Sequence, residues 1–443
     1  MHISRRQFIG GAAATASLAW WGRLPEVRAQ DGSARKLRVA QIGCGGRGAA
    51  LFGMWRNEEL VAAVDTNRRA VDQFNPDRFP KLGRYTDYRT MYENHMDEID
   101  AVIVATPDHQ HFPAAMLALR AGKAVYCEKP LAWSMSECFA LARIVEARQR
   151  PSQMGNQGNG GAGWREIYSI VHQDILGPIK EVHTWTNRPI WPQGQPAPTG
   201  DHPVPDHLDW DSWIGPAPLR AYHPEIEPFK WRGYYDYGCG ALGDMACHTM
   251  NAIFQTLKPG YDCTVEPLRV EGRSEHLFPA KEIIKWVFAP TSDGPGFDAY
   301  WYDGGLKPEK PAALGAHDLP NTGSMFIGTK GVLISHGDYN DGNAVYIDGQ
   351  QVQPSFEPLP TPPARDIQAE FVQAAKGELA WDATISNFMY AGKMSAIIAM
   401  GPIAERVDKK ITFSSETMRF DDDAANRLMH RPPREGWEKA YTA

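Results

Sequence analysis

The sequence predicts two domains: an α/β domain whose parallel sheet is wound by helices on both faces, and then an α+β domain with a mostly antiparallel sheet. Short apolar strands alternate with helical segments between residues 37 and 150, which is typical of a doubly wound parallel sheet. Later segments are rich in β-branched and aromatic residues, with Gly or Asp turns between them, as in successive antiparallel strands. The length of 443 residues also favours two domains over one.

The composition is that of a globular protein. Hydrophobic residues make up 43% of the chain and charged residues 22%, and no low-complexity tract interrupts it. The formal net charge of -7 argues against a nucleic acid as a partner. The six cysteines lack the spacing of a zinc site, so we predict free thiols and no metal.

The N-terminal segment 1–29 has the features of a twin-arginine signal peptide. Arg5 and Arg6 precede a weakly apolar run, and the small residues around Ala29 suit cleavage by signal peptidase. A short membrane anchor is the alternative, but the run is shorter than the roughly 20 residues that span a bilayer. We therefore expect residues 30–36 to form a linker and the mature protein to be periplasmic or otherwise extracytoplasmic, without membrane contact. Proteins on this route are exported folded, typically around a cofactor.

The first domain, residues 37–160, begins with the signature of a dinucleotide site. The apolar strand LRVAQI runs directly into Gly43-x-Gly45-x-x-Gly48, a helical pattern follows, and a second strand ends at Asp65, 22 positions after Gly43. The glycines permit a tight turn, a close approach to the pyrophosphate and close helix packing. This context predicts a Rossmann domain that binds a dinucleotide.

Asp65 favours NAD as the dinucleotide. A carboxylate at the end of the second strand accepts hydrogen bonds from the adenosine ribose hydroxyls and repels a 2′-phosphate. Arg68 and Arg69 leave NADP open, because they could reach a 2′-phosphate; the alternative is that they lie on a solvated helix face. FAD is a weaker candidate.

The next strands of the parallel sheet place polar residues at the ligand-binding edge. Thr106 and Pro107 follow one strand, and Glu128, Lys129 and Pro130 follow the next. A lysine in a partly buried cleft near a cationic nicotinamide should have a lowered pKa, which suits proton exchange with a hydroxyl. The alternative for Lys129 is a solvated loop residue.

Several motifs, in this order along the chain, resemble those of the glucose-fructose oxidoreductase, inositol dehydrogenase and rhizopine-catabolism (Gfo/Idh/MocA) family. They are GCGGRG with Asp65, ATPDHQHFPAAMLALRAGKAVYCEKPL, GALGDMACHTMN and FIGTKGVLI. The resemblance implies a second domain, residues 161–443, built on an open and mostly antiparallel sheet, and activity on sugars, inositols or their derivatives. In relatives the outer face of that sheet commonly makes the oligomer contact, which implies a homodimer or homotetramer.

The resemblance also implies roles for individual residues. Lys129 would contact the reacting hydroxyl, His248 would act as base, and Asp244 would orient the substrate or the imidazole. The Lys129-Pro130 bond is expected to be cis, as it often is in the family. The cofactor site would include Gly43, Gly45, Gly46, Arg47, Gly48, Asp65, Thr106, Pro107, His111, Glu128, Lys129 and Gln157.

Asp244 and His248 allow other interpretations, because their i, i+4 spacing places both side chains on one face of a helix. A metal half-site is one, although no third ligand stands at a recognisable spacing. A helix cap followed by a packed histidine is another.

A Pro- and Trp-rich segment, residues 192–233, interrupts the second domain. A loop of this length with so many aromatic residues is expected to be ordered, with aromatic faces that suit the C–H surfaces of sugar rings; for each single Trp, plain packing is the stronger alternative. The substrate site would include Lys129, Asn187, Arg188, Trp191, Trp231, Arg232, Asp244 and His248.

These features predict an exported oxidoreductase that transfers a hydride between a nicotinamide dinucleotide and a ring hydroxyl of a carbohydrate. The periplasm has no replenished pool of NAD, so the cofactor is expected to stay tightly bound. The alternative is an NAD-dependent glycoside-cleaving enzyme that acts by transient oxidation at C3 and elimination, although GDMACHTMN follows the dehydrogenase form. A sugar sensor without activity is disfavoured because Lys129 and His248 are both present.

Overall fold

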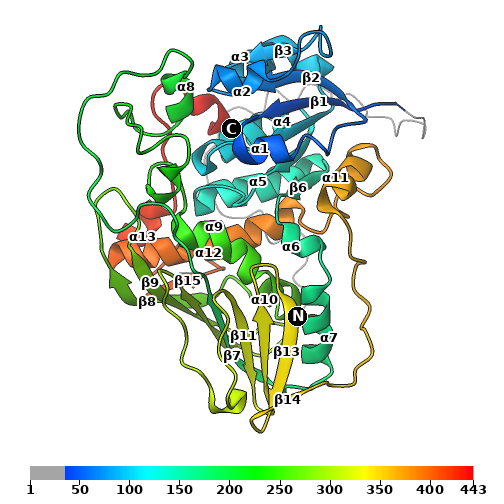
Figure 1. Cartoon of the computed structure of the whole chain (residues 1–443), viewed down its shortest axis with the longest axis vertical. Helices are drawn as coiled ribbons and strands as arrows, with labels where there is room; N and C mark the ends of the chain where they lie inside the picture. Colours follow the sequence, from blue (N-terminus) through cyan, green and yellow to red (C-terminus); the bar gives the residue numbers. More distant parts are fainter. Residues whose placement is uncertain (1–34, 443) are drawn as a thin grey trace. The chain divides into compact units, whose positions relative to one another are not determined.

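The computed structural model describes residues 35–442, which belong to one compact unit (Figure 1). The predicted signal peptide and most of the predicted linker lie outside these residues. Among the helices of the described part, none is long and apolar enough to cross a membrane.

The first sheet has six strands, all parallel, in the order β3-β2-β1-β4-β5-β6. The chain reverses its direction of winding between β1 and β4, and in open α/β sheets ligands bind at the carboxyl ends of the strands beside such a point. Strands β4 and β5 are buried along their whole length, as expected for a sheet covered on both faces. The strands are β1 (Arg38–Ile42), β2 (Glu59–Val64), β3 (Gly83–Tyr85), β4 (Ala101–Val104), β5 (Ala124–Cys127) and β6 (Ser152–Met154).

Helices connect these strands, as the alternating pattern predicted. Helix α5 begins with a capping box, in which Ser134 and Glu137 each accept from the other's main-chain N–H. Helix α1 is shorter than the sequence suggested, because Gly46, Gly48 and Gly53 disfavour helix and the chain continues in turns up to β2. The helices are α1 (Gly46–Ala50), α2 (Arg68–Asp72), α3 (Tyr88–His95), α4 (His111–Arg120) and α5 (Met135–Arg148).

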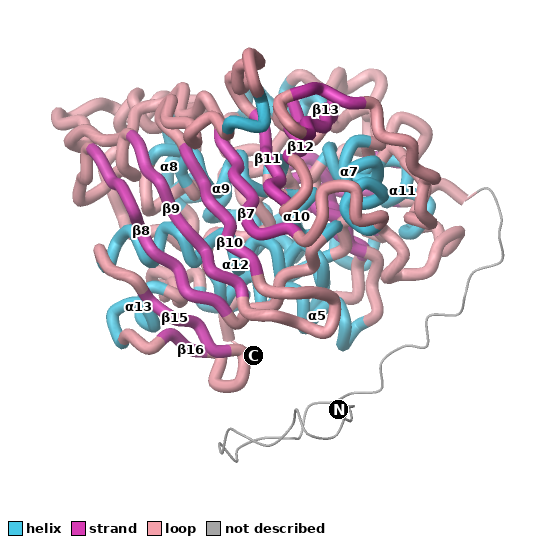
Figure 2. The backbone as a smooth tube through the Cα atoms, turned by 90° about the horizontal axis from the view of Figure 1, so that it is seen from below, coloured by secondary structure: helices cyan, strands magenta, loops and turns pink. Residues whose placement is uncertain are grey.

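The second sheet has ten strands and is antiparallel except for the pair β7 and β10 (Figure 2). Its order is β14-β13-β12-β11-β7-β10-β9-β8-β15-β16, which confirms an open, mostly antiparallel sheet. The strands are β7 (Ile179–Trp185), β8 (Cys263–Glu271), β9 (Lys281–Phe288), β10 (Phe297–Tyr302), β11 (Gly323–Gly328), β12 (Val332–His336), β13 (Asp341–Ile347), β14 (Gln350–Val352), β15 (Ile411–Ser414) and β16 (Arg419–Phe420).

Helix α12 (Phe388–Val407) joins the two halves of the molecule. It packs against α5 on one side and against α9 (Gly240–Thr249) and β8 on the other. Ile284, Trp286 and Phe288 alternate on the inner face of β9, and the indole of Trp286 donates to the carbonyl of Ile397 at 3.2 Å. One hydrophobic core therefore extends from the first sheet through α12 to the second.

The remaining helices are α6 (Gln157–Gly160), α7 (Gly163–His172), α8 (Trp210–Ile214), α10 (Asn251–Thr256), α11 (Ile367–Ala375) and α13 (Asp423–Leu428). Helices α6, α9 and α10 lie between the two sheets and carry the polar residues described below (Figure 1).

Candidate functional site

The glycine turn after β1 has the geometry that its motif predicts. Gly43 has a φ of +86°, and a Cβ there would lie 2.4 Å from the carbonyl oxygen of Ala105. A Cβ on Gly48 would lie 2.1 Å from the oxygen of Gly43. A Cβ on Gly45 would meet no atom closer than 3.7 Å, and one on Gly46 would meet none within 4 Å. Gly43 and Gly48 thus have no room for a side chain, whereas a Cβ on Gly45 would make ordinary van der Waals contacts and Gly46 borders open space.

Asp65 braces this turn. Its Oδ2 accepts from the backbone N–H groups of Cys44 at 2.8 Å and Gly45 at 3.0 Å, and its Oδ1 accepts from Asn67 at 2.9 Å. Burial raises the pKa of the carboxyl, and these three hydrogen bonds oppose that shift. Each carboxylate oxygen has more than one acceptor site, so the role of holding the turn is compatible with the predicted contact to ribose hydroxyls.

Two buried polar atoms at the predicted nucleotide site have no hydrogen-bond partner among the described residues. They are Oγ1 of Thr106, directly after β4, and Nε2 of Gln157, the first residue of α6. Nearby, Nε of Arg47 lies 2.9 Å from Oε1 of the buried Glu128. Unsatisfied buried groups in a native protein call for a partner, and a bound dinucleotide supplies polar atoms of both kinds. The residues present therefore fit the predicted cofactor.

His111 has a structural role that the sequence did not predict. Its Nδ1 lies 2.7 Å from the carbonyl oxygen of Pro130, and its Nε2 lies 3.0 Å from that of Thr106. Burial lowers the pKa of this histidine to about 4. Both ring nitrogens face main-chain carbonyls, and a neutral imidazole carries one proton, so His111 donates to one of these two carbonyls at a time and links the loops after β4 and β5. A contact of His111 with the nucleotide stays a prediction.

Lys129 and Asp244 converge as predicted. The Nζ of Lys129 lies 2.8 Å from Oδ1 of Asp244 and also donates to its carbonyl oxygen at 3.1 Å. The two side chains are only 18% and 16% exposed. Lys129 comes from the end of β5 and Asp244 from α9, so the ion pair joins the two sheets' contributions to one site. The Lys129-Pro130 bond is cis, as expected.

The protonation state of Lys129 differs from the prediction. Burial does act to lower the pKa of its ammonium, but the negative charge and hydrogen bond of Asp244 outweigh burial, so that the pKa is raised. The same pair lowers the pKa of Asp244 against the effect of burial. Lys129 is therefore a stable hydrogen-bond donor rather than a base.

His248 lies one helical turn after Asp244 and is 4% exposed. Burial, and then the charge of Lys129, lower its pKa to about 3, so the imidazole is neutral around pH 7. Its Nδ1 lies 3.2 Å from Oδ1 of Asn156, and its ring packs edge-on against Tyr339 with centroids 5.0 Å apart. The imidazole is thus held by Asn156, whereas Asp244 holds Lys129. This corrects the option in which Asp244 orients the imidazole.

Asp108 is a further member of the cluster that sequence reasoning missed. It is 5% exposed and begins the 3-10 helix Asp108–Gln110 after β4. Burial raises its pKa to about 7; Arg232, Lys129 and a hydrogen bond with the thiol of Cys239 oppose that shift, and Asp244 reinforces it. A carboxyl that titrates near neutral pH beside an ion pair can bind or release a proton during a reaction.

Arg232 lies at the rim of this cluster. Its guanidinium stacks over the rings of Trp231 at 4.3 Å and Phe229 at 4.7 Å, and its Nε lies 3.8 Å from Oδ1 of Asp244. Trp231 is buried, and its indole donates to the carbonyl of Pro228 at 3.2 Å. Phe229 is 43% exposed, so it offers the open aromatic face here rather than Trp231.

The other predicted substrate residues divide into two groups. Trp191 is buried and packs edge-on against Phe229, with centroids 6.2 Å apart, which brings it near Arg232. Asn187 and Arg188 hydrogen-bond to each other, and the carbonyl of Arg188 accepts from Gly304 at 2.8 Å. Within the described residues, no hydrogen bond or ion pair links Asn187 or Arg188 to Lys129, Asp244 or His248.

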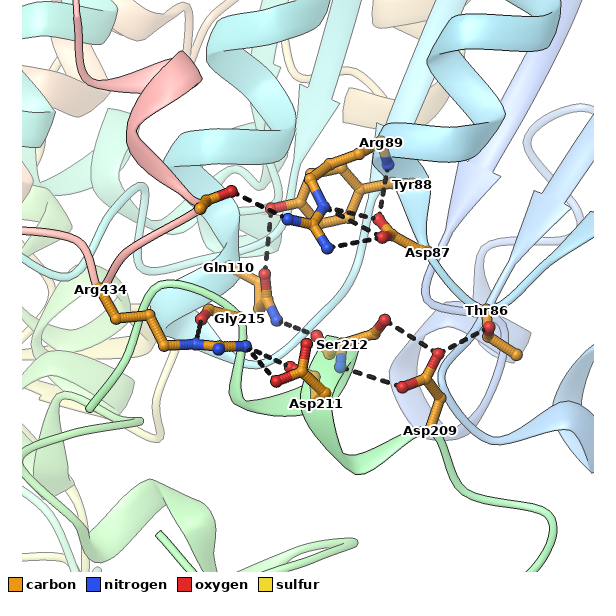
Figure 3. A network of polar contacts seen from close by, with 11 residues as sticks. Thr86, Asp87, Tyr88, Arg89, Gln110, Asp209, Asp211, Ser212, Gly215 and Arg434 are labelled. Carbon is orange, nitrogen blue, oxygen red and sulfur yellow. Dashed lines mark hydrogen bonds and ion pairs between the residues drawn. The ribbon is translucent and has the colours of Figure 1, made fainter. Parts of the chain in front are cut away.

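Residues 207–215 are the part of the long Pro- and Trp-rich segment that contacts the first domain, and we call them the strap. Arg68 donates its backbone N–H to His207 at 2.9 Å, and Asp209 donates to Thr66 at 2.8 Å, so the strap pairs with the turn that follows Asp65. The side chain of Asp209 also accepts from Thr86 at 2.8 Å (Figure 3).

The strap has two further anchors. Nε2 of Gln110 donates to the carbonyls of Ser212 at 2.8 Å and Trp213 at 2.9 Å. The guanidinium of Arg434, near the end of the chain, binds the carboxylate of Asp211 at 2.7 Å (Figure 3). The strap is therefore fixed next to the turn that follows Asp65, and it is also held by Gln110 and Arg434.

Glu227 brings a second carboxyl to the ribose end of the site. Burial raises its pKa, and the negative charge of Asp65 raises it further. Arg68 and Arg69 are exposed on α2. Among the described residues, no group of three or more His, Cys, Asp and Glu side chains is arranged to hold a metal ion.

Two family models match the chain. Residues 37–156 match the model described as "Oxidoreductase family, NAD-binding Rossmann fold". Residues 165–279 and 328–439 match the one described as "Oxidoreductase family, C-terminal alpha/beta domain". The first match covers the six-stranded sheet, and the second covers the ten-stranded sheet except for β9, β10 and nearly all of β11.

Curated relatives and solved structures share parts of this architecture. The chain is 32% identical over 152 residues to "Glycosyl hydrolase family 109 protein 1" of Shewanella sp. (strain ANA-3), which covers 32% of this chain and 33% of the relative. It is 29% identical over 206 residues to "Alpha-N-acetylgalactosaminidase" of Shewanella oneidensis, covering 40% of this chain and 45% of the relative. These matches thus span less than half the length of either relative.

Among solved structures, an inositol dehydrogenase homolog from Azotobacter vinelandii, complexed with NADH and myo-inositol, has the same fold. It superposes with a TM-score of 0.57 at 18% identity, covering 87% of this chain and all of that one (100%).

Proposed function

The chain belongs to the Gfo/Idh/MocA oxidoreductase family, with its NAD-binding Rossmann fold. We therefore propose that it transfers a hydride between a tightly bound NAD and a ring hydroxyl of a sugar, glycoside or cyclitol. The observation that carries the proposal is the pairing of Lys129 with Asp244 at 2.8 Å beside the neutral His248, at the carboxyl ends of β4 and β5. The two groups supply a fixed hydrogen-bond donor and a proton acceptor for one hydroxyl.

The residues that would hold NAD are the glycine turn, Asp65, Thr106, Gln157 and the Arg47–Glu128 pair. When bound, NAD supplies the hydride acceptor. Two carboxyls favour NAD over NADP: Asp65 and Glu227, whose pKa is raised by burial and by the charge of Asp65, would both repel a 2′-phosphate.

Lys129, His248 and Asp244 have different roles toward the substrate. The ammonium of Lys129 donates a hydrogen bond to the reacting oxygen and stabilises negative charge as the proton leaves. Neutral His248 accepts that proton on its free ring nitrogen while the ring carbon is oxidised to a carbonyl. Asp244 holds Lys129 in place and keeps it charged. Acid–base help of this kind contributes about 10² to 10⁴ in rate.

The strap supports a retained cofactor. Its backbone pairs with residues 66–68, just after Asp65, and contacts with Thr86, Gln110 and Arg434 hold it there. A nucleotide whose ribose binds Asp65 would lie next to this segment, and we expect the contacts of the strap to slow its release. A bound cofactor that is re-oxidised by a second substrate, or within one catalytic cycle, suits an enzyme in a compartment without an NAD supply.

One experiment tests the proposed function directly. The folded protein is purified, its nucleotide is released and identified, and a panel of glycosides and cyclitols is screened for reduced nicotinamide and ketosugar. We expect NAD at close to one per chain, and a Lys129→Ala variant that keeps the nucleotide but no longer reduces it. Turnover retained by Lys129→Ala would overturn the mechanism.

A second candidate is an NAD-dependent glycosidase that oxidises C3 transiently and eliminates the aglycone. It is supported by the names of the curated relatives and by Asp108, a carboxyl that titrates at about pH 7 in the same cluster and could protonate a leaving group. Incubation in deuterated water separates the candidates: elimination releases aglycone and places deuterium at C2, whereas simple oxidation yields ketosugar with its aglycone attached. Sugar binding without any redox change would instead indicate a homologue without activity.

Export and assembly complete the proposal. Arg5 and Arg6 support a twin-arginine signal, and the open sheet offers an outer face for a homodimer or homotetramer. Cell fractionation of the native protein and of an Arg5→Lys, Arg6→Lys variant tests the first, with the variant expected to stay in the cytoplasm. Light scattering of the purified protein tests the second.

A further inference from the structure

We propose that the tautomer of His248 is set by a directed chain of hydrogen bonds that begins at the main-chain carbonyl of Ile385 and runs through Asn159, Asn251 and Asn156 to Nδ1 of the imidazole. Asn156 and Asn251 are then positioning residues. Their catalytic meaning rests on the proposed function, but the tautomer itself does not.

The chain starts at Asn159, whose orientation is fixed by a group that can only accept. Its Nδ2 lies 3.1 Å from the carbonyl oxygen of Ile385, so the amide nitrogen must face that carbonyl. Its Oδ1 then faces the other way, where it receives Nε2 of Gln255 at 2.8 Å and Nδ2 of Asn251 at 3.3 Å. The reversed amide would place oxygen against oxygen at Ile385.

The orientation of Asn159 fixes the orientation of the Asn251 side-chain amide. Because its Nδ2 is directed to Asn159, its Oδ1 faces the opposite side. There it accepts from Nδ2 of Asn156 at 3.0 Å and from the hydroxyl of Tyr390 at 2.8 Å. Because two donors bind this oxygen, the orientation of the Asn251 amide is fixed, like that of Asn159.

Asn251 in turn fixes the orientation of Asn156, whose side-chain amide contacts the imidazole of His248. With its Nδ2 donating to Asn251, its Oδ1 points to Nδ1 of His248 at 3.2 Å. A carbonyl oxygen accepts, so Nδ1 must carry a proton. A neutral imidazole carries one proton, so Nε2 is left with its lone pair. No described residue forms a hydrogen bond with Nε2, which leaves it for a substrate hydroxyl.

The surroundings of His248 keep it neutral, which the argument requires. Burial, the ammonium of Lys129 and the guanidinium of Arg47 all disfavour imidazolium, and Asp244 opposes them only in part. Tyr339 covers the ring edge-on. Asn156 follows β6 of the first sheet, whereas His248 belongs to α9 and Asn251 to α10. The chain of amides therefore also links the part of the site that follows the first sheet to helices of the second domain.

The direct test is the nitrogen NMR spectrum of the purified, nucleotide-loaded protein with ¹⁵N-labelled histidine. The resonances of His248 are assigned by their loss in a His248→Gln variant. We expect a protonated Nδ1 and an unprotonated Nε2 at neutral pH. A proton on Nε2 would overturn the proposal, whatever the enzyme's activity, and a correct tautomer in a protein without turnover would leave the proposal standing while removing the proposed function.

Variants supply a second test. Asn156→Leu removes the acceptor, so we expect the two tautomers to mix, kcat to fall about 10- to 100-fold with little change in KM, and the acid limb of the pH profile to move. Asn343→Leu is the matched control, because the amide of Asn343 donates to Gly163 and Glu166 and has no hydrogen bond with the chain of amides; it should keep the tautomer and kcat. An unchanged tautomer in a folded Asn156→Leu protein would contradict the proposal. If this variant does not fold, the spectrum of the native protein still decides.

Discussion

Lys129 and Asp244 stand 115 positions apart in the chain, yet their charged groups lie 2.8 Å apart in a site where both are largely removed from solvent. The pairing reverses the effect of burial on the lysine, because a buried ammonium without this carboxylate would lose its proton more readily. The charge on Lys129 therefore depends on Asp244.

Asp244→Asn should convert Lys129 from a fixed cation into a titrating group. We expect the pKa of Lys129 to fall, kcat to fall by about 10²-fold or more, and bound NAD to remain. A pH–rate profile shows the change as a new limb on the alkaline side. Asp236→Asn, in the segment before α9, is the control, and equal losses in both variants would contradict the role of Asp244.

Asp108 should make the stability of the fold depend on pH. Its folded pKa is raised to about 7, so its contribution to stability is full below the unfolded value and is lost as the pH rises through about 7. Asp108→Asn should therefore unfold at a higher denaturant concentration than the native protein above pH 7, with a smaller difference in acid. Asp77→Asn, on the surface, is the control. A gain that is the same at every pH would show that the charge of Asp108 is not its cause.

Loosening the strap should speed the release of the nucleotide. Asp209→Ala removes the acceptor for Thr86 and the cap of α8, in which Asp209 accepts from Ser212. The loss of such contacts typically costs about 1 kcal/mol each, so dissociation of NAD should become up to roughly 30-fold faster. Stopped-flow displacement with excess nucleotide measures this rate. Asp201→Ala, exposed in the same segment, should leave it unchanged, and equal rates in both variants would assign the strap no part in retention.

Glu227→Gln should weaken the preference for NAD. Removing one of two neighbouring carboxyls at the ribose end reduces the repulsion of a 2′-phosphate, so the ratio of the two dissociation constants should move toward NADP by several-fold. Equilibrium binding of both nucleotides to protein stripped of its cofactor gives the ratio. Glu225→Gln, whose partner is Lys230 in the same loop, is the control. An unchanged ratio would mean that Asp65 alone discriminates.

The glycine turn, the parallel sheet and the mostly antiparallel sheet could be predicted because each leaves a local pattern. Gly43 and Gly48 show this most clearly, since their spacing alone implies the close contacts that the structure contains. The sign of the pKa shift of Lys129 could not be predicted, because it depends on a distance between residues far apart in the chain.

The residues around the imidazole were missed for the same reason. Asn156 lies in a Gly- and Asn-rich stretch that resembles a hinge, and Tyr339 lies in a turn after β12 without any motif. Only the assembled fold brings them to His248. The carbonyls of Pro130 and Thr106, which the ring nitrogens of His111 face, could not be predicted either, because this contact also depends on how two loops meet in the fold.

The anchor of the strap on Arg434 has a consequence for biosynthesis. The glycine turn and Asp65 belong to the first domain, whereas Arg434, whose guanidinium binds the strap, comes 369 positions after Asp65. The strap therefore cannot reach its final position until the segment around Arg434 has been synthesised and has folded against it. The ribose end of the predicted nucleotide site thus reaches its final form later than the first domain that carries the glycine turn.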